Sequence, residues 1–322
     1  MSSSSDILRV VPLTPDLGAK IEPEEMQAWL PRSDKVKCRD RRLMPEEALA
    51  EGMSARWRAE LELVFERRAA RTVLASRRHE GPLVVQKALY PEGEATCHAI
   101  VLHPPAGIAG GDQLSIRLEV GERAHALLTT PGAGKWYRSA GPWATQNLNF
   151  RVAADALLEW LPQETLLFDG ARAGLHAEVH LQQGARYIGW EVLCLGRTGS
   201  GERFVHGECR LDSSIYLGPT LSWLERGGFV GDDALLRSPA GLAGFPVCGT
   251  MAAIGPVTDD LLAACRAVRV DGGAVTRLPD LLLARYLGPS GGAARRYFSA
   301  LWRVLRPAFG GRVAIDPRIW AT

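Results

Sequence analysis

Short runs of alternating apolar and polar residues, separated by tight turns, dominate residues 56–257 of the chain. Alternation with a period of two residues is typical of half-buried β-strands, because successive side chains of a strand point to opposite faces. The turns recur at intervals of about 30 residues, which is a period typical of repeat architectures. Hairpin turns are expected at residues 91–94, 121–123, 153–155, 182–184 and 212–214.

Three of these turns share a frame, in which an apolar residue is followed by three variable positions and then alanine. The frame spans residues 120–124, 152–156 and 181–185, and residues 211–215 nearly fit it. A repeat with one hairpin per unit favours stacked β-layers, as in a β-helix, where each unit buries one face against the next. A β-sandwich also gives many short strands with frequent turns, so it remains the alternative.

After residue 257 the period of the apolar residues changes to that of a helix. Thr258 and Ser290 are residue types that cap helix N-termini, and Pro307 is expected to end the last helix. The pattern predicts helices over residues 261–269, 279–287 and 291–306, the last with a stripe of Phe298, Leu301, Trp302 and Leu305. A small α-helical part, at about 258–306, should therefore pack on the β-body and precede a C-terminal tail.

Residues 1–55 differ in character from the rest of the chain. They contain a serine run, several prolines and a charged stretch at residues 35–42, and they show no strand alternation. Such composition favours a flexible or loosely docked extension. We therefore expect an extension at 1–55, followed by one large domain at 56–322.

Composition indicates a globular protein and disfavours several classes of partner. The 322 residues are 46% hydrophobic, which is enough for a substantial core. The formal net charge of +2 disfavours nucleic acid or a membrane surface as the main partner. Neither an 18-residue apolar run nor a signal-peptide pattern is present, so a cytoplasmic protein is expected. The six cysteines are dispersed, which favours reduced thiols over disulfides or a zinc site.

The glycine-rich segments do not form a nucleotide site. A phosphate-binding loop needs a glycine separated by four residues from its Gly-Lys pair, and a Ser or Thr directly after that pair. Around Gly134 and Lys135 these positions hold Thr129 and Trp136. No nucleophile elbow and no H-E-x-x-H pattern occurs either, so no catalytic cluster is evident. We expect no nucleotide bound by this chain and no enzymatic activity.

Acidic residues inside apolar strands are the most unusual chemical feature of the sequence. Glu191 lies in an apolar run over residues 187–195, and Glu159 lies between two apolar residues, with Glu164 and Asp169 soon after. An unpaired buried carboxylate is costly, so each must be ion-paired, protonated, hydrated or bound to a cation. One interpretation is a set of salt bridges to Arg151, Arg172 or Arg197. The other is a hydrated passage for a divalent ion.

The motifs between His103 and Ser139 resemble those of a known family. The segment reads HPPAGIAGGD and then TTPGAGKWYRS, and it is followed by LEWLPQET, FDGAR, GWE, LGR and a closing PRIW. These motifs are similar, in the same order, to those of the UreD (UreH) family of urease accessory proteins, from about Trp57 to the C-terminus. Ala106, Gly134 and Trp136 depart from the usual family residues, but none of these changes alters a charged position.

The resemblance implies a mainly β body built as a helical-like stack, which favours the β-helix-like alternative over the sandwich. It also implies a cytoplasmic, non-enzymatic scaffold that joins apo-urease to UreF and to the GTPase UreG during nickel insertion. No stably bound cofactor is expected, although Ni²⁺ in transit is. The candidate residues of a nickel path are His103, Asp112, Glu159, Glu164, Asp169 and Glu191, and the candidate partner-binding residues are Tyr137 and Arg138.

An all-β hydrolase is the alternative from another functional class. Paired carboxylates such as Glu159 and Glu164 could act as general acid and base on a glycoside. A substrate groove of that kind should display exposed aromatic residues, for which Trp160 and Trp190 are the candidates.

Overall fold

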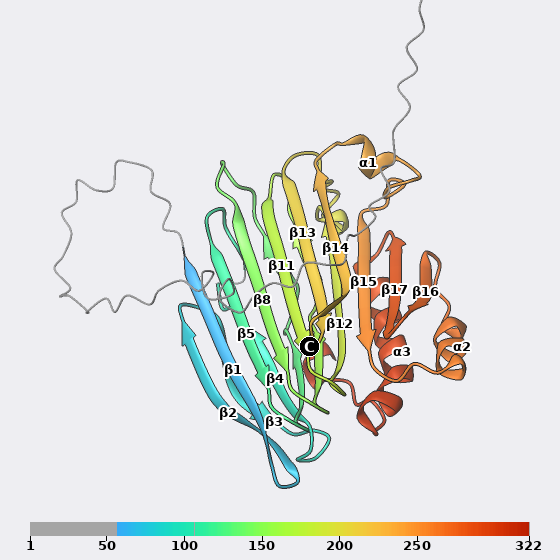
Figure 1. Ribbon diagram of the computed structural model, residues 1–322. Coiled ribbons are helices and arrows are strands. Elements are labelled where there is room, and N and C mark those ends of the chain that lie inside the picture. The colour runs from blue at the N-terminus through green and yellow to red at the C-terminus, as the bar shows by residue number, and fades with distance from the viewer. Residues whose placement is uncertain (1–56, 106, 322) are drawn as a thin grey trace, which may run out of the picture. The chain divides into compact units, whose positions relative to one another are not determined.

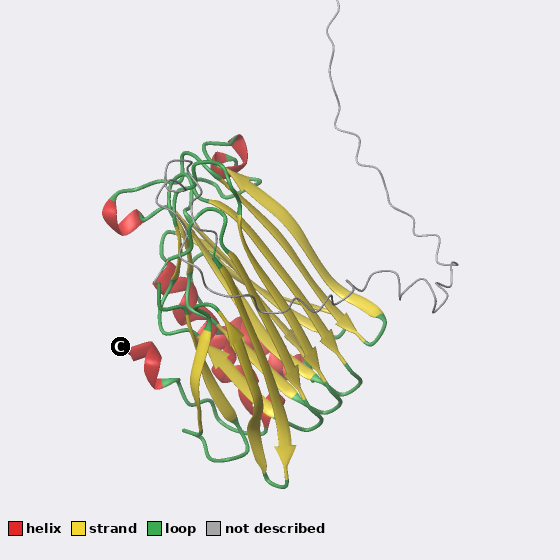
Figure 2. Ribbon diagram, turned by 90° about the vertical axis from the view of Figure 1, so that its left-hand side faces the viewer, coloured by secondary structure: helices red, strands yellow, loops and turns green. Residues whose placement is uncertain are grey.

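The computed structural model describes residues 57–105 and 107–321 (Figure 1). The chain divides into two units, Met1–Gly52 and Met53–Thr322, and the second contains all of the described residues. The extension predicted at residues 1–55 lies outside the described residues. Two large sheets face each other in the second unit, and helices cover the outer face of one of them (Figures 1 and 2).

The first sheet, here sheet A, has the strand order β14-β13-β11-β8-β5-β1-β2. Its strands are β1 (Arg58–Arg68), β2 (Arg71–Glu80), β5 (Gln113–Val120), β8 (Ala144–Val152), β11 (Arg172–Leu181), β13 (Glu208–Leu217) and β14 (Thr220–Val230).

The second sheet, sheet B, has the order β16-β17-β15-β12-β9-β6-β4-β3, with β7 and β10 beside β12. Its strands are β3 (Val84–Leu89), β4 (Cys97–Leu102), β6 (His125–Thr129), β7 (Gly134–Trp136), β9 (Leu157–Leu161), β10 (Thr165–Leu167), β12 (Arg186–Leu195), β15 (Val247–Ile254), β16 (Gly273–Leu278) and β17 (Leu281–Gly288).

The repeated turns carry the chain from sheet A to sheet B, so the strands that flank them do not pair with each other. Val120, Val152 and Leu181 end β5, β8 and β11 at matched positions of adjacent parallel strands. The N–H of Ala153 donates to the carbonyl of Val120, and the N–H of Gln182 to that of Val152. Successive coils therefore stack in register, which confirms the predicted β-helix-like body.

The alanine that closes each frame lies at the corner where the chain enters sheet B. Ala124, Ala156 and Ala185 are all buried, and a larger side chain would push the coil away from its neighbour. Arg123 and Asp155, which precede two of these alanines, adopt left-handed backbone conformations with φ of 55° and 58°. The frame read from the sequence is thus the corner of one solenoid coil.

Two of the predicted turns differ from these corners. Residues 91–94 connect β3 to β4, which pair antiparallel, so this turn is the hairpin that was expected. The turn predicted at residues 212–214 is wrong, because these residues lie inside β13. The chain turns at Gly218, whose N–H donates to the carbonyl of Leu181.

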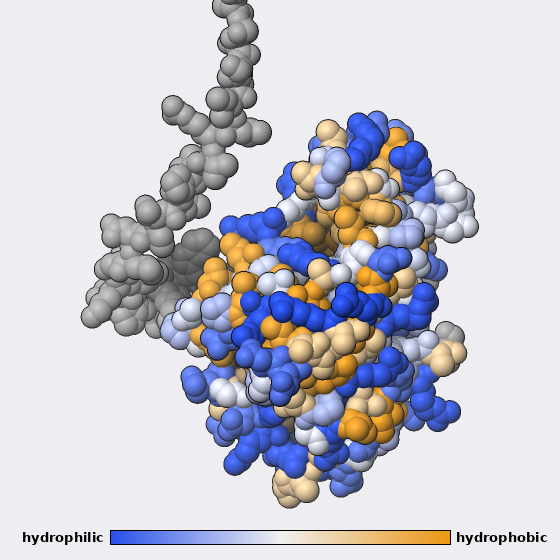
Figure 3. All heavy atoms as spheres, turned by 90° about the vertical axis from the view of Figure 1, so that its right-hand side faces the viewer, coloured by the Kyte–Doolittle hydropathy of each residue, from blue (hydrophilic) through white to orange (hydrophobic). Residues whose placement is uncertain are grey.

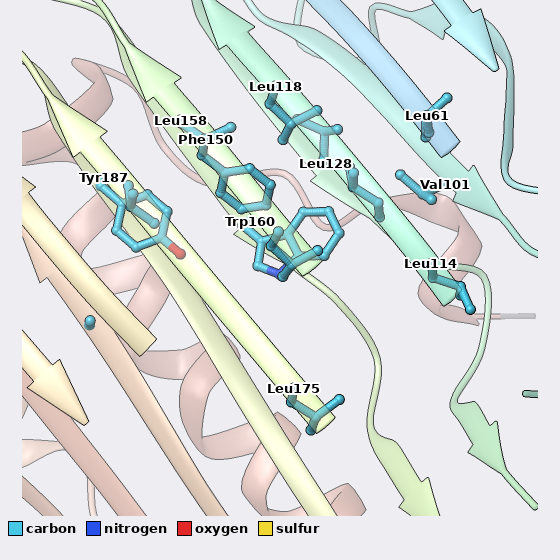
Figure 4. Packing of buried hydrophobic residues seen from close by; sticks show 14 of the residues in the cluster. Leu61, Val101, Leu114, Leu118, Leu128, Phe150, Leu158, Trp160, Leu175 and Tyr187 are labelled. Carbon is cyan, nitrogen blue, oxygen red and sulfur yellow. The ribbon is translucent and has the colours of Figure 1, made fainter. Parts of the chain in front are cut away.

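Apolar side chains fill much of the space between the sheets (Figure 4). Phe150 of β8 and Trp160 of β9 contact each other with ring centroids 5.2 Å apart, and Tyr187 of β12 lies in the same cluster. A second cluster covers the opposite face of sheet B, where the long helix α3 (Gly291–Gly310) packs. Strands β9 and β12 are therefore buried on both faces.

Both predicted helix caps are confirmed. The Thr258 side chain accepts from the N–H of Leu261 at the start of α2 (Asp259–Ala267), and that of Ser290 accepts from Ala293 in α3. The predicted apolar stripe of α3 is buried against sheet B. The remaining helical segments are the short α1 (Ala234–Arg237), η3 (Thr198–Ser200) and η4 (Arg318–Ala321).

Two predictions in the C-terminal part are wrong. Residues 279–287 do not form a helix, because β17 occupies this region and pairs with β15 and β16. Leu281 and Leu283 face one core cluster and Leu282 the other, and a strand buried on both faces has no polar alternation that would distinguish it from a helix. Pro307 does not end α3, which continues to Gly310 and is capped by the left-handed Gly311. The β-body thus extends beyond residue 257.

Within the described part of the chain, no helix combines the length and the apolar character that crossing a membrane would require. On the face shown in Figure 3, hydrophobic residues lie in several patches between hydrophilic ones.

Candidate functional site

Two adjoining cavities lie between the sheets. The larger has a volume of about 400 Å³ and is lined by His103, Glu164 and Glu191 among others. The smaller has a volume of about 90 Å³ and extends toward Glu225 of β14 and Thr250 of β15. Gln146, Trp160 and Glu191 line both cavities. The core between the sheets therefore contains a hollow whose mainly apolar walls carry a few polar side chains.

Glu191 occupies the centre of this hollow because of its position in β12. Tyr187 and Leu193 belong to the cluster between the sheets, so Glu191, two residues from Leu193, points the same way. The Thr165 hydroxyl donates a hydrogen bond to its carboxylate at 2.5 Å. Among the described residues no arginine or lysine pairs with it, and burial raises the pKa of Glu191 to about 7. The predicted salt bridge to Arg151, Arg172 or Arg197 is therefore absent at this residue.

Glu164 and His103 lie on the wall of the larger cavity. The Glu164 carboxylate, whose side chain is 16% exposed, is 3.8 Å from Nε of Arg295 in α3. Burial lowers the pKa of His103, and the nearby Asp112 carboxylate only partly opposes this effect. Neutral His103 keeps a nitrogen lone pair available to a cation at neutral pH.

Glu159 lies on the opposite face of sheet B. Its neighbours in β9, Leu158 and Trp160, face the core between the sheets, and successive side chains of a strand point to opposite faces. Glu159 is fully buried against α3 and forms an ion pair with Nε of Arg306 at 3.0 Å. His125 contacts the same carboxylate at 2.5 Å, and the Trp302 indole N–H donates to it. Burial alone would raise the pKa of Glu159, but His125 and Arg306 together hold it below its ordinary value. A salt bridge was predicted here, although with a different arginine.

The ion pair of Glu159 is part of a larger buried network. Arg306 is also 2.9 Å from Glu92, and Glu92 contacts His98 at 2.5 Å. The network connects α3 to the β3–β4 hairpin and to β9 across the second core. Its groups stabilise one another and do not line the cavities between the sheets.

Asp112 and Asp169 hold corner loops. Asp112 accepts hydrogen bonds from the N–H groups of Ala109 and Trp57, at 2.8 and 3.1 Å. Asp169 accepts from the N–H groups of Val205 and His206, at 2.8 and 2.7 Å. The His206 side chain, together with these N–H groups, opposes the effect of partial burial and keeps the pKa of Asp169 below its ordinary value. Both carboxylates thus have structural tasks, and neither lines the two cavities.

Tyr137 and Arg138 lie at the surface beside these loops. The Tyr137 ring packs edge-on against Phe168, with centroids 5.1 Å apart, and remains 38% exposed. Arg138 pairs with Asp169 at 3.1 Å while most of its side chain stays exposed. A β-carbon at Gly107 would lie 2.0 Å from the Tyr137 ring, so the glycine-rich motif and the TTPGAGKWYRS motif pack directly on each other.

Several polar residues of the smaller cavity were not predicted from the sequence. Glu225 and Thr250 are joined by a hydrogen bond of 3.4 Å, and Arg285 contacts both. Glu225 was visible as an acid in an alternating strand, but most acids in such positions face solvent. Only the pairing of the strands shows that it points into the hollow.

No resident metal centre is evident in residues 57–105 and 107–321, which contain no group of three or more His, Cys, Asp or Glu side chains that could hold a metal ion. The five cysteines within these described residues are free thiols. Burial raises the pKa of Cys194 and Cys248 to about 12, so both stay protonated at neutral pH and are poor metal ligands. Among the described residues that line the hollow, the strong metal ligands are therefore carboxylates and histidine.

The chain is similar to known proteins over most of its length. Residues 58–321 match the family described as UreD urease accessory protein. The urease accessory protein UreD of Dechloromonas aromatica is 55% identical over 276 residues, which cover 84% of this chain and 96% of the relative. That of Azoarcus sp. is 53% identical, with 83% and 94% covered, and that of Pseudomonas aeruginosa is 48% identical, with 83% and 95% covered. The chain therefore belongs to the UreD family of urease accessory proteins.

Proposed function

We propose that this chain is a non-enzymatic cytoplasmic scaffold required for nickel insertion into apo-urease, which it links to UreF and to the GTPase UreG. Membership of the urease accessory family is the observation that carries the proposal. The absence of a phosphate-binding loop from the sequence supports the assignment of the nucleotide to a partner.

We further propose that Ni²⁺ passes through the hollow between the sheets. His103, Glu164 and Glu191 offer nitrogen and oxygen ligands on one continuous wall. Too few of them converge to retain the ion, which suits transit and not storage. Glu159, Asp112 and Asp169 are left out of this path, because ion pairs and backbone N–H groups already occupy their carboxylates.

The pKa of Glu191 is suited to such a passage. With a pKa of about 7, its carboxyl group is close to half protonated when the hollow holds only water. An arriving Ni²⁺ ion can therefore displace a proton, so the buried site gains about one unit of positive charge instead of two. A carboxylate with an ordinary pKa would carry an uncompensated charge in the core whenever no cation is bound.

The hydrolase alternative is not supported by the positions of its two carboxylates. Glu159 has no exposed surface and faces α3, whereas Glu164 lines the cavity between the sheets. A glycosidase pair must flank one substrate. Trp160 and Trp190, the proposed aromatic platform, are both buried. Hydrolysis of a glycoside panel that disappears in Glu164→Gln would nevertheless overturn the non-enzymatic assignment.

The scaffold role is tested by assembly and activation together. The full-length chain should co-purify with UreF, UreG and apo-urease, and its omission should leave urease inactive at physiological nickel. Tyr137→Ala combined with Arg138→Ala tests the exposed corner as a partner surface, with Arg296→Ala, an exposed arginine of α3, as the control. Normal urease activation without this chain would contradict the proposal.

A further inference from the structure

A third hollow, of about 550 Å³, lies where the solenoid corners meet the C-terminal end of α3. Four arginines line it, Arg67, Arg123, Arg186 and Arg312, together with His125 and Asp155. We call it the arginine pocket. None of its lining residues lines either cavity between the sheets, so it is separate from the proposed nickel path.

The fold itself brings these side chains together. Arg123 and Asp155 hold the same position in successive corners, and Arg186 directly follows the next corner. Arg67 lies near the end of β1 on the neighbouring coil, and Arg312 follows the last turn of α3. Stacked coils thus place charged residues that are distant in sequence around one opening.

The positive charge of the arginine pocket is largely uncompensated. None of the four guanidinium groups lies within 4.0 Å of a carboxylate of a described residue, although fifteen other arginines do. Asp155 supplies a single negative charge on the wall. Burial lowers the pKa of His125, which is engaged with Glu159, so this histidine is neutral and adds no charge.

Backbone carbonyls occupy only part of the donor capacity. Arg186 donates to the carbonyls of Phe309 and Asp155, and Arg312 donates to that of Glu92. The Nε of Arg186 is buried and has no acceptor among the described residues. Arg123 forms no hydrogen bond with any described residue through its side chain. If the arginines served only to donate hydrogen bonds to backbone carbonyls, these donors would have no partner. Such a role would also not explain why four mutually repelling cations lie around one opening.

We propose that the arginine pocket binds a phosphate-type oxyanion. A guanidinium group presents paired N–H donors that match two oxygens of such an anion, and a charge-assisted hydrogen bond is stronger than one to a neutral carbonyl. Arg123 and Arg312 supply exposed donors at the rim, and Arg186 supplies a buried donor at the wall. The bound anion would also tie the end of α3 to the solenoid corners.

The test is a titration of the full-length chain with inorganic phosphate at constant ionic strength, followed by calorimetry. Arg123→Gln should weaken binding roughly tenfold, because it removes one charge-assisted contact. Arg296→Gln is the matched control, since Arg296 is exposed on the same helix as the pocket and lies about 21 Å from Gly310 along the axis. Circular dichroism and thermal unfolding confirm that each variant folds.

A second arm uses phenyl phosphate in place of the inorganic ion. Binding of both ligands indicates a pocket for the phosphoryl group of a larger molecule, and binding of inorganic phosphate alone indicates a free anion, so either outcome supports the proposal. The absence of saturable binding by both ligands would overturn it. Equal affinities of the wild-type chain and Arg123→Gln would overturn it as well.

Discussion

At the scale of single residues, the position of an acid within its strand decides its role. Glu159 and Glu191 both lie in strands that are buried on two faces, yet they point to opposite sides of sheet B. Arg306 compensates the charge of Glu159 and, together with the hydrogen-bonded His125, lowers its pKa, whereas Glu191 has only a threonine hydroxyl and titrates near neutrality. The sequence shows that both acids lie among apolar residues, but it does not show which of them has a cationic partner.

The raised pKa of Glu191 should make the stability of the chain depend on pH. The pKa of Glu191 is raised in the folded chain from 4.5 to about 7. Its carboxyl group therefore contributes fully to the free energy of unfolding below the unfolded pKa, and this contribution is lost as the pH rises through 7. Glu191→Gln has no carboxyl group to ionise, so it does not lose stability in this way. Its free energy of unfolding should exceed that of the wild type by at most about 3 kcal/mol at pH 8, and the difference should shrink toward pH 5.

Urea unfolding at the two pH values measures this difference. The control is Glu119→Gln, which changes an exposed carboxylate of sheet A that forms no ion pair with any described residue. A constant difference between wild type and Glu191→Gln across this pH range would show that the carboxyl group titrates normally.

At the scale of elements, the repeating frame of apolar residue and alanine predicted the corners and the stacked body. The same pattern could not show that the turns cross between sheets, because a hairpin and a solenoid corner need the same small and polar residues. Strand β17 was mistaken for a helix since both of its faces are apolar, and only its pairing with β15 fixes its identity. Local capping signals were sufficient at Thr258 and Ser290.

The second prediction tests the corner formed by the glycine-rich motif. Gly107→Ala should destabilise the chain by about 1–3 kcal/mol, because the added methyl group meets the Tyr137 ring and forces it away from Phe168. Thermal unfolding measures the loss. Gly132→Ala is the control, since a β-carbon there has no neighbour within 4 Å. Equal effects of the two substitutions would indicate that the corner adapts freely.

At the scale of the whole molecule, two sheets enclose a hollow that runs from β7 to β14 and β15. Polar side chains lie at intervals along its walls. Family motifs in the sequence were sufficient to indicate the urease accessory role, which the relatives support. Of the six residues predicted to lie on a nickel path, His103, Glu164 and Glu191 share the hollow. The remaining three could not be separated from them beforehand, because most of their partners, such as Trp57, His206 and Arg306, are distant in the sequence.

The central claim is that nickel reaches urease through this hollow, and activation of apo-urease at limiting nickel tests it most directly. Complexes that contain Glu191→Gln or Glu164→Gln should assemble normally but activate urease roughly tenfold more slowly, because each loses a ligand on the path. Glu119→Gln, on the outer face of sheet A, should activate urease at the wild-type rate. Wild-type activation by both cavity variants, in complexes of unchanged composition, would contradict the account.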